Sequence, residues 1–352
     1  MTSKRVMVAM SGGVDSSVAA LLLKKSGYEV VGATMLLGTG QKRACESAAT
    51  SVSSHVAIVE QVCSLLDIPF HIIDAETEFK RYVINYFCQE YMKGRTPNPC
   101  ITCNKYIKFG LLLDYAISSG FDYLATGHYA RIIERDGTYH LLKGSDEAKD
   151  QSYMLYTLSQ DKLKRVLFPV GEYSKVVVKE LAKSHGLPNW NRPESQDLCF
   201  VASNYRDFLR HYLQPQRGII VDSRGRVIGE HDGVMFYTIG QRHNLGIATG
   251  EPAYVIEIDA DRNLLRVGGE KELYKSRCLV TNVNWVLGRP LATTMEVCVK
   301  IRYKTPEQPA VIHVGDEYVE ILFHKAQRAV TPGQAAVFYL NDEVIGGGII
   351  SG

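Results

Sequence analysis

The stretch MVAMSGGVDSSVAALL, residues 7–22, decides the fold, because it joins a short apolar run to an amphipathic run through two adjacent glycines. A strand that leads directly into a helix through Gly12 and Gly13 leaves the backbone N–H groups of the helix N-terminus open to an anion. The serines of the loop add hydroxyl donors, and Asp15 adds a carboxylate that can hold magnesium or orient the loop. The stretch predicts a nucleotide site after the first strand of an α/β sheet.

The spacing of this loop separates it from two other phosphate-binding motifs. No Lys-Ser or Lys-Thr pair follows the glycines, as in a Walker A loop, and the dinucleotide pattern G-x-G-x-x-G is missing. The pattern S-G-G-x-D-S after a first strand resembles instead the pyrophosphatase loop (PP-loop) of enzymes that split ATP into AMP and pyrophosphate to adenylate a substrate. The alternative is an ordinary strand-to-helix turn with a serine or glycine cap.

The first half of the chain alternates between runs typical of strands and runs typical of amphipathic helices. The predicted strands are residues 4–10, 29–36, 69–75 and 123–129. The predicted helices are residues 14–27, 51–67, 76–94, 152–166 and 174–186. This alternation predicts an α/β fold with a doubly wound parallel sheet flanked by helices.

From about residue 205 the helical pattern fades, and alternating segments joined by Gly, Asn and Asp turns follow. These segments are residues 218–229, 253–269, 296–303, 317–325 and 335–350. They predict antiparallel sheets or small barrels. We therefore expect three domains: an α/β adenylating domain at 1–205, a small β-rich central domain at 206–275 and a C-terminal β-barrel at 276–352.

The composition predicts a protein of a reducing compartment. The 352 residues include eight cysteines, too few for a disulfide scaffold, and the N-terminus carries no apolar segment with a small-residue cleavage site. No window approaches the roughly 18 apolar residues that a membrane span needs. We expect a cytoplasmic protein without a membrane partner.

The charge balance predicts that any nucleic-acid surface is local, since 40 basic side chains stand against 38 acidic ones. Residues 91–113 contain basic side chains but no Asp or Glu. The basic residues are Lys93, Arg95, Lys105 and Lys108. They indicate a positive patch, and the alternative is a solvated helix face.

The segment NPCITCNKYIKFG, residues 98–110, supplies a candidate nucleophile. A helix that begins at about Asn104 would leave Cys103 near its N-terminus, where the dipole and two neighbouring lysines favour a thiolate. The two-residue spacing of Cys100 and Cys103 also suits a redox pair or a zinc site. A further cysteine, Cys199, lies in ESQDLCF, a predicted loop at the edge of the α/β domain, and such loops often carry chemistry.

These segments form a set of motifs that spans the chain. The set is SGGVDSS, GRTPNP-x-x-x-C-N-K-x-I-K-F-G, ATGHYAR, KDQSYML, ESQDLCF, YTIGQR, IRY, and TPGQAAVFY with GGGII. It resembles the tRNA-specific 2-thiouridylase family from end to end. The resemblance implies that ATP adenylates the C2 oxygen of the wobble uridine of certain tRNAs, and that sulfur then displaces AMP. It also implies an adenylating domain, a small central β domain and a C-terminal β-barrel that contacts tRNA.

The resemblance also implies roles for individual residues. The ATP site falls on Ala9, Met10, Ser11, Gly12, Gly13, Val14, Asp15, Ser16, Met35 and Gly127. The target-base segment is Asn98, Pro99 and Cys100, the catalytic nucleophile is Cys103, and the persulfide is carried by Cys199. The tRNA contacts fall on His128, Lys149, Asp150, Gln151, Arg302, Tyr303 and Gln334. ATP, Mg²⁺, tRNA and a sulfur-donor protein are the implied cofactors and partners.

The chain departs from the family at one position, because many members carry Asp where Cys100 stands. A thiol therefore stands in place of the carboxylate, and an acid or base role assigned to that carboxylate does not carry over to Cys100. Cys100, Cys103 and Cys199 become three candidate ligands of a four-iron four-sulfur cluster, whose fourth iron would bind sulfide. The alternative is a persulfide on Cys199, released when Cys103 forms a disulfide with it.

Two other functions would use parts of the same sequence. An adenylating ligase or amidotransferase for a small molecule needs the phosphate loop, but neither the C-x-x-C pair nor the β domains. A non-catalytic RNA-binding protein could hold structural zinc with the three cysteines and a histidine such as His185. For single residues, the alternatives are a satisfied core histidine at His128 and a plain helix start at 149–151.

Overall fold

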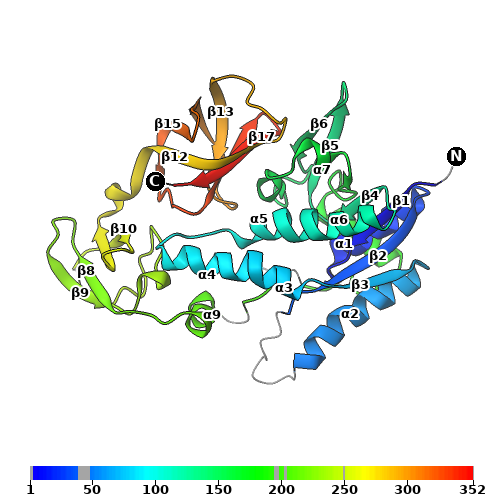
Figure 1. The fold of residues 1–352 in the computed structure, drawn as a ribbon, viewed down its shortest axis with the longest axis horizontal. Helices are drawn as coiled ribbons and strands as arrows, with labels where there is room; N and C mark the ends of the chain where they lie inside the picture. Colours follow the sequence, from blue (N-terminus) through cyan, green and yellow to red (C-terminus); the bar gives the residue numbers. More distant parts are fainter. Residues whose placement is uncertain (1–2, 39–47, 194–197, 202–203, 249, 352) are drawn as a thin grey trace.

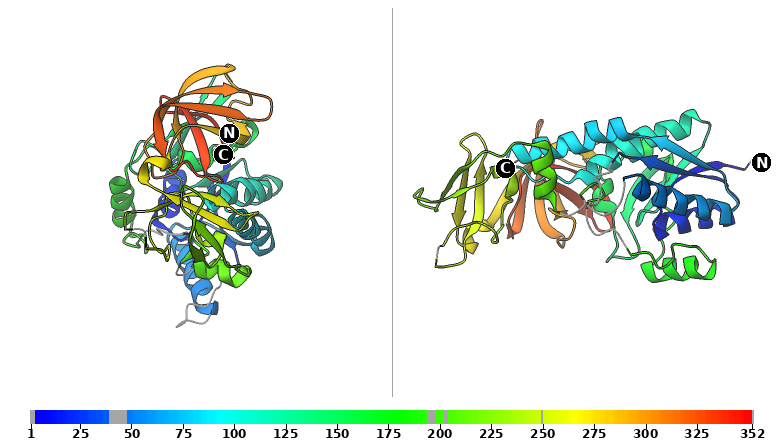
Figure 2. Two further views of the ribbon diagram at one scale, coloured as in Figure 1. Left: turned by 90° about the vertical axis from the view of Figure 1, so that its left-hand side faces the viewer. Right: turned by 90° about the horizontal axis from the view of Figure 1, so that it is seen from below.

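The computed structural model describes residues 3–38, 48–193, 198–201, 204–248 and 250–351, without the side chains of 48–54. An α/β part carries the N-terminus, and a small β part lies at the opposite end of the molecule (Figure 1). A barrel that carries the C-terminus lies between them when the molecule is seen from below (Figure 2).

The α/β part is built on a five-stranded parallel sheet of order β3-β2-β1-β4-β7. The strands are β1 (Arg5–Ala9), β2 (Glu29–Leu36), β3 (Phe70–Asp74), β4 (Tyr123–Thr126) and β7 (Val166–Leu167). The chain moves outward from β1 on one side and from β4 on the other, so the strand order reverses between them. Such sheets bind ligands at the carboxyl ends of the strands beside this reversal. The prediction of a doubly wound sheet is confirmed, with the phosphate loop after β1 and Gly127 after β4 at the reversal.

Helices cover both faces of the sheet, because successive buried side chains of β1 point to opposite faces. Val6 and Val8 share a core with α1 (Val14–Lys25), α2 (Ala48–Leu65) and α8 (Lys175–Ser184). Met7 packs on the other face, against the long helical segment 99–118. This segment comprises α5 (Pro99–Cys103), the π-helix η2 (Asn104–Leu112) and α6 (Leu113–Ser118).

The predicted helix 76–94 forms as α3 (Glu76–Phe79), the π-helix η1 (Lys80–Ile84) and α4 (Asn85–Met92). Phe87 of α4 packs against Phe208, with ring centroids 5.9 Å apart. Phe208 belongs to α9 (Tyr205–Tyr212). The prediction that helical structure fades at residue 205 is therefore wrong for these residues, and Asn204 caps α9 by accepting a hydrogen bond from the N–H of Asp207.

The central β part is a four-stranded sheet of order β10-β11-β8-β9. Its strands are β8 (Gly218–Val221), β9 (Val227–His231), β10 (Tyr254–Asp259) and β11 (Leu264–Gly268). The pairs β8–β9 and β10–β11 are antiparallel, as predicted, whereas β11 and β8 run parallel. Its apolar side chains form one core with α4 and α9, so the central part is packed on the α/β part.

The C-terminal part is a closed antiparallel barrel, because β12 pairs with both β15 and β17. The strand order is β12-β15-β14-β13-β16-β17. The strands are β12 (Tyr274–Trp285), β13 (Thr294–Lys300), β14 (Gln308–Val314), β15 (Val319–Arg328), β16 (Ala335–Leu340) and β17 (Glu343–Ile350). The barrel prediction is confirmed, although the strands β12 and β14 were not predicted from the sequence.

A hairpin from the first half of the chain extends the barrel sheet. Strands β5 (Ala130–Arg135) and β6 (Thr138–Lys143) form it, and β6 pairs with β17 through Leu142 and Glu343. The hairpin was not predicted. The predicted helix 152–166 is also wrong: this stretch forms the 3₁₀ turn η3 (Ser152–Leu155), the short helix α7 (Gln160–Leu163) and the first residue of β7.

Among the described residues, no helix is long and apolar enough to cross a membrane.

Candidate functional site

The phosphate loop turns at Gly12, whose φ of +70° lies in the left-handed region that favours glycine. Gly13 then caps α1 in an extended conformation. The hydroxyl of Ser16 donates to the carbonyl of Gly13 and accepts from the N–H of Ser11, at 3.1 and 3.2 Å. The serines therefore fix the loop from within, which supports an anion site at the N-terminus of α1.

The carboxylate of Asp15 is held by side chains that the sequence did not single out. The Nζ of Lys175, at the start of α8, lies 2.7 and 2.8 Å from its two oxygens, and the hydroxyl of Tyr129 donates to Oδ1 at 2.7 Å. An ion bound directly by Asp15 would have to displace Lys175. Of the two roles expected for Asp15, orientation of the loop fits this geometry and direct magnesium binding does not.

A turn after β4 presses against the phosphate loop. A Cβ at Gly127 would lie 2.6 Å from the N of Ser16 and 2.7 Å from the carbonyl carbon of Asp15. The predicted strand 123–129 ends at Thr126, so residues 127–129 form a turn at the site instead of continuing the strand. Met35 is a partly buried residue of β2, the strand next to β1, and it packs against two of the apolar cores.

The segment after α8 also reaches the loop. Asn189 is buried, and its Nδ2 donates to the carbonyl of Gly12 at 3.0 Å and to the hydroxyl of Ser17 at 2.9 Å. Arg192 donates to the same carbonyl at 3.2 Å. Sequence analysis missed Lys175, Tyr129, Asn189 and Arg192, because no local motif marks a residue that reaches the loop from 110 or more positions away.

The paired cysteines lie on a helix that begins earlier than predicted. Pro99 is its first residue, and the side chain of Asn98 caps it by accepting from the N–H of Cys100 at 3.1 Å. Cys100 therefore lies in the first turn, while Cys103 is the last residue of α5, immediately before the π-helix η2. The prediction that Cys103 stands near a helix N-terminus is wrong, since a proline and an asparagine cap start the helix at residue 99.

The thiols near this helix are protonated rather than activated. Burial raises the pKa of Cys100 and of Cys103, and the charge of Lys108 only partly opposes this effect. Desolvation raises the pKa of Cys199 to about 12, and the nearby Cys103 and Cys100 act in the same direction. The expected resting thiolate at Cys103 is therefore not found. The mutual influence of the three thiols places them in one neighbourhood, although Cys199 is itself exposed, between the half-buried Leu198 and the buried Phe200.

These cysteines do not form a ready metal site. Within the described ranges, which include all three, no three His, Cys, Asp or Glu side chains are placed to hold a metal ion together. Residues 194–197 of the predicted loop before Cys199 lie outside the described residues. The Nδ1–H of His185 instead donates a hydrogen bond to the carbonyl of Leu181, and its ring contacts Lys25 on the surface. The geometry fits neither a zinc site nor a preformed cluster site.

His128 directly follows Gly127 and therefore lies beside the nucleotide loop. It is buried, with Nδ1 2.7 Å from the hydroxyl of Thr126 and Nε2 3.5 Å from the Nζ of Lys108. Burial, together with Lys108, holds the pKa of His128 well below its ordinary value. His128 is thus a satisfied, neutral histidine that lies next to Lys108, and the charge of Lys108 also reaches Cys100 and Cys103.

Residues 149–151 support the turn that carries His128. Gln151 accepts a hydrogen bond from the N–H of Tyr129 at 3.0 Å, and its own N–H donates to the carbonyl of Tyr129 at 2.8 Å. Asp150 is buried and accepts from Gly144 and from Ser152. Lys149 is half-buried beside them. The hydrogen bonds of Asp150 and Gln151 stabilise the turn before η3, which agrees with the alternative of a plain helix start at 149–151.

The basic patch is smaller than the sequence suggested. Glu90 lies just before the acid-free window and pairs with both Lys93 and Arg95, at 3.4 and 2.9 Å. Lys105 is exposed, with its Nζ 5.2 Å from the ring centroid of Tyr106. Lys108 alone of the four faces the cysteines.

The barrel contributes the remaining predicted residues. Arg302 is half-buried and donates to the carbonyl of Ala329 at 2.9 Å and to the hydroxyl of Thr331. Tyr303 has its ring 6.1 Å from that of Tyr153 in η3. Gln334 donates a hydrogen bond to the carbonyl of Thr96, two positions before Asn98. These contacts place IRY and TPGQ against the α/β part, close to the target-base segment.

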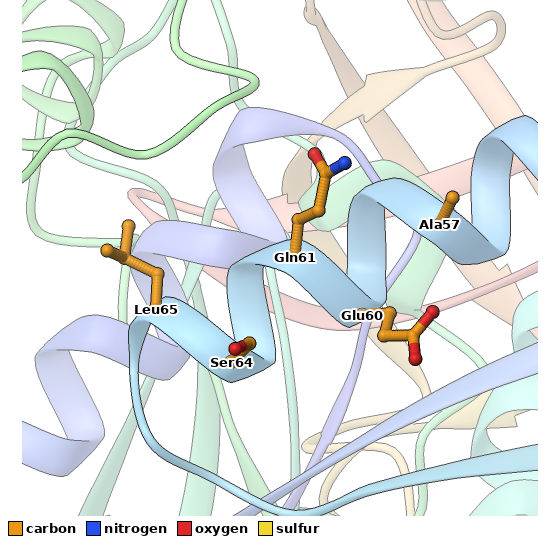
Figure 3. Close-up of a pocket in the computed structure, with 5 residues that line it drawn as sticks. All are labelled: Ala57, Glu60, Gln61, Ser64 and Leu65. Atoms are coloured by element: carbon orange, nitrogen blue, oxygen red, sulfur yellow. The ribbon is translucent and has the colours of Figure 1, made fainter.

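A shallow hollow on the outside of α2 is separate from this site. Its lining side chains come from one helix, as Figure 3 shows, and they are Ala57, Glu60, Gln61, Ser64 and Leu65. None is a cysteine or part of the phosphate loop, so the hollow offers no comparable chemistry.

Comparison with known proteins agrees with this architecture. The family model described as "tRNA methyl transferase HUP domain" matches residues 4–203. The model described as "tRNA methyl transferase PRC-barrel domain" matches residues 206–269, and "Aminomethyltransferase beta-barrel domain" matches 275–350. A PP-loop at the reversal of a doubly wound sheet, followed by two β domains, defines a class of nucleotide-dependent enzymes.

The relatives identify the family within that class. The chain is 46% identical to the tRNA-specific 2-thiouridylase MnmA of Carboxydothermus hydrogenoformans over 99% of this chain and 97% of that protein. It is 44% identical to the protein of the same name from Clostridium acetobutylicum, over 99% of each chain. The chain belongs to the tRNA-specific 2-thiouridylase family. A solved 4-thiouridine synthetase–RNA complex with bound ATP is 17% identical, with a TM-score of 0.36, over 59% of this chain and 50% of that one.

Proposed function

We propose that this protein is an ATP-dependent sulfurtransferase that replaces the C2 oxygen of the wobble uridine of tRNA with sulfur. The observation that carries the proposal is the turn after β4. Its Gly127 lies against the phosphate loop, and the adjacent His128 contacts Lys108, whose charge reaches Cys103. A base held between them would meet the nucleotide on one side and a sulfur donor on the other.

In the first step, the C2 oxygen of the uridine attacks the α-phosphorus of ATP, and pyrophosphate leaves. The oxygen becomes part of a good leaving group, AMP. The phosphate loop holds the nucleotide through backbone N–H groups, and the turn at Gly127 closes the site beside it. Magnesium, when bound, would neutralise the phosphates, and the paired Asp15 leaves it to be held by phosphate and water oxygens.

In the second step, Cys199 carries a persulfide received from a sulfur-donor protein. Its terminal sulfur attacks C2 of the adenylated uridine, and AMP leaves with the electron pair of the C2–O bond. Cys103 must lose its proton at this step; its sulfur then attacks Sγ of Cys199, which forms a Cys103–Cys199 disulfide and releases the 2-thiouridine sulfur. A thiol reductant returns both cysteines to their starting state. The mutual proximity of Cys103 and Cys199 supports this route.

We prefer the persulfide route to the cluster route. A four-iron cluster needs three thiolates arranged as ligands, whereas the three cysteines form no such group among the described residues. Cys100 then lines the target-base segment without a role in sulfur transfer.

We also propose that tRNA lies across the α/β part and the barrel, where TPGQ meets the target-base segment. Lys149, Arg302 and Tyr303 are partly exposed there and are candidates for direct contacts. His128, Asp150 and Gln151 would act through the turn that they stabilise.

Transfer of labelled sulfur tests the function. Protein loaded with ³⁵S-persulfide and mixed with ATP and tRNA should give labelled tRNA, with one AMP and one pyrophosphate formed per sulfur. Release of ADP and phosphate would reject the adenylation step. Adenylation of a small molecule without any label in tRNA would favour the ligase alternative.

A further inference from the structure

The phosphate loop has no net positive charge with which to meet ATP. A Walker A loop carries its own lysine for the phosphates, whereas SGGVDSS contains no basic residue. Its acidic residue, Asp15, is neutralised by Lys175. The backbone N–H groups and serine hydroxyls of the loop are uncharged, so the roughly four negative charges of a triphosphate must be balanced from outside the loop, by magnesium and by basic side chains.

Two side chains from distant elements converge on the centre of the loop. A Cβ at Gly12 would lie 3.2 Å from Nη1 of Arg192 and 3.1 Å from Nδ1 of His55. Arg192 comes from the segment after α8 and His55 from α2. Both side chains therefore lie next to Gly12, in the loop whose backbone N–H groups would meet a phosphate.

Arg192 is held in place but keeps donors for a ligand. One bond from Nη1 to the carbonyl of Gly12 fixes it, and Asn189 anchors the same segment to that carbonyl. A guanidinium has five N–H donors, so most remain for another partner. Among the residues that the structure describes, no carboxylate lies within ion-pairing distance of Arg192, which is exposed.

His55 contributes a neutral donor or acceptor next to this cation. Burial, reinforced by the charge of Arg192, lowers the pKa of His55 below its ordinary value. The pair thus has one positive charge at neutral pH and is directed at the loop.

We infer that Arg192, with His55 beside it, binds the pyrophosphate moiety of ATP over the phosphate loop; the inference rests on the proposed adenylation. A guanidinium binds phosphate oxygens in a bidentate manner and can stabilise the charge that the leaving pyrophosphate develops. Since Arg192 lies seven positions before Cys199, the same contact would tie nucleotide binding to the segment that carries the sulfur.

Equilibrium binding of three ligands to the full chain tests this role. We expect Arg192→Gln to weaken the binding of ATP and of inorganic pyrophosphate by about 10- to 100-fold, the range of a charged hydrogen bond, and to leave AMP within about twofold. Arg192→Lys should restore part of the loss. Lys179→Gln removes an exposed charge from the neighbouring helix α8 and is the matched control.

Two outcomes would overturn the inference. Equal losses for ATP and AMP would mean that Arg192 only supports the Gly12 carbonyl, and unchanged binding of all three would mean that it plays no part. The wild-type protein gives a second measurement that does not depend on folding of a variant: pyrophosphate should protect Arg192 from phenylglyoxal, as mapped by mass spectrometry, and AMP should not. Loss of labelled-sulfur transfer in the wild type would instead reject the proposed function itself.

Discussion

The Nε2 of Gln334 donates a hydrogen bond of 2.7 Å to the carbonyl oxygen of Thr96. The N–H of Thr96 donates in turn to the carbonyl of Pro332 at 2.9 Å, and its hydroxyl lies 3.1 Å from that of Thr238 in the central part. Thr96, two positions before the target-base segment at Asn98, is thus hydrogen-bonded to both the barrel and the central part. The three parts of the molecule meet where the base is expected to enter.

Replacement of Gln334 by Ala should loosen the barrel from this segment. We expect a three- to tenfold fall in tRNA affinity, about 1 kcal/mol for one hydrogen bond, with ATP binding unchanged. Gln327→Ala, which removes a partly exposed glutamine of the same barrel, is the control. Filter binding of tRNA measures both variants, and an equal loss in the two would reject a specific role for the Thr96 contact.

Removal of either partner of the Asp15–Lys175 pair should disable the loop. Lys175→Met leaves the Asp15 carboxylate without its main partner, so we expect a loss of about 1–3 kcal/mol in unfolding free energy and loss of adenylation. Asp15→Asn in the same chain should recover part of the stability. Asp15→Ala should abolish AMP formation but leave tRNA binding largely intact. Urea denaturation and AMP release provide the measurements, and additive effects in the double variant would show that the pair is not coupled.

A methyl group at Gly127 should block the nucleotide site. Its Cβ would lie 2.6 Å from the N of Ser16, a backbone atom that cannot move without opening the start of α1. We expect Gly127→Ala to reduce ATP affinity at least tenfold. Gly269→Ala places its Cβ no closer than 3.9 Å to any atom outside its own chain neighbours and is the control. Retention of wild-type ATP affinity would contradict the proposed closure.

Substitution of each of the three cysteines should affect sulfur transfer differently. In the persulfide route, Cys103→Ser and Cys199→Ser each abolish sulfur transfer, whereas Cys100→Ser retains most of it. Iron and acid-labile sulfide are measured in anaerobically purified protein beside the transfer rate. The persulfide route would be overturned if the wild type contained stoichiometric iron and Cys100→Ser lost both the iron and the activity. That result would establish the cluster.

Acid should destabilise the protein in part through His128. Its pKa is lower when folded than when unfolded, so its neutral form stabilises the fold fully above the ordinary value of 6.5. This stability is lost as the pH falls below that value, at up to about 1.4 kcal/mol per pH unit. We expect His128→Gln to lose less unfolding free energy between pH 7.5 and 5.5 than the wild type, with His324→Gln on the barrel surface as control. Equal losses in all three proteins would show that His128 does not contribute.

The sequence by itself determined the features that depend on local pattern. The junction at Gly12 and Gly13 predicted the phosphate loop, and the two periodicities predicted the parallel sheet and the later antiparallel strands. They did so because backbone geometry, apolar alternation and turn residues act over a few positions. The motifs also sufficed to recognise the family.

Only the tertiary structure decided the environment of each group. The start of the helix at Pro99, the burial of Cys103 and the pairing of Glu90 with Arg95 together removed the predicted thiolate and half of the positive patch. A thiol pKa depends on desolvation by side chains from several elements, which no short window contains. Lys175 and Arg192 reach the loop across at least 160 positions for the same reason: their contacts exist only after the chain has folded.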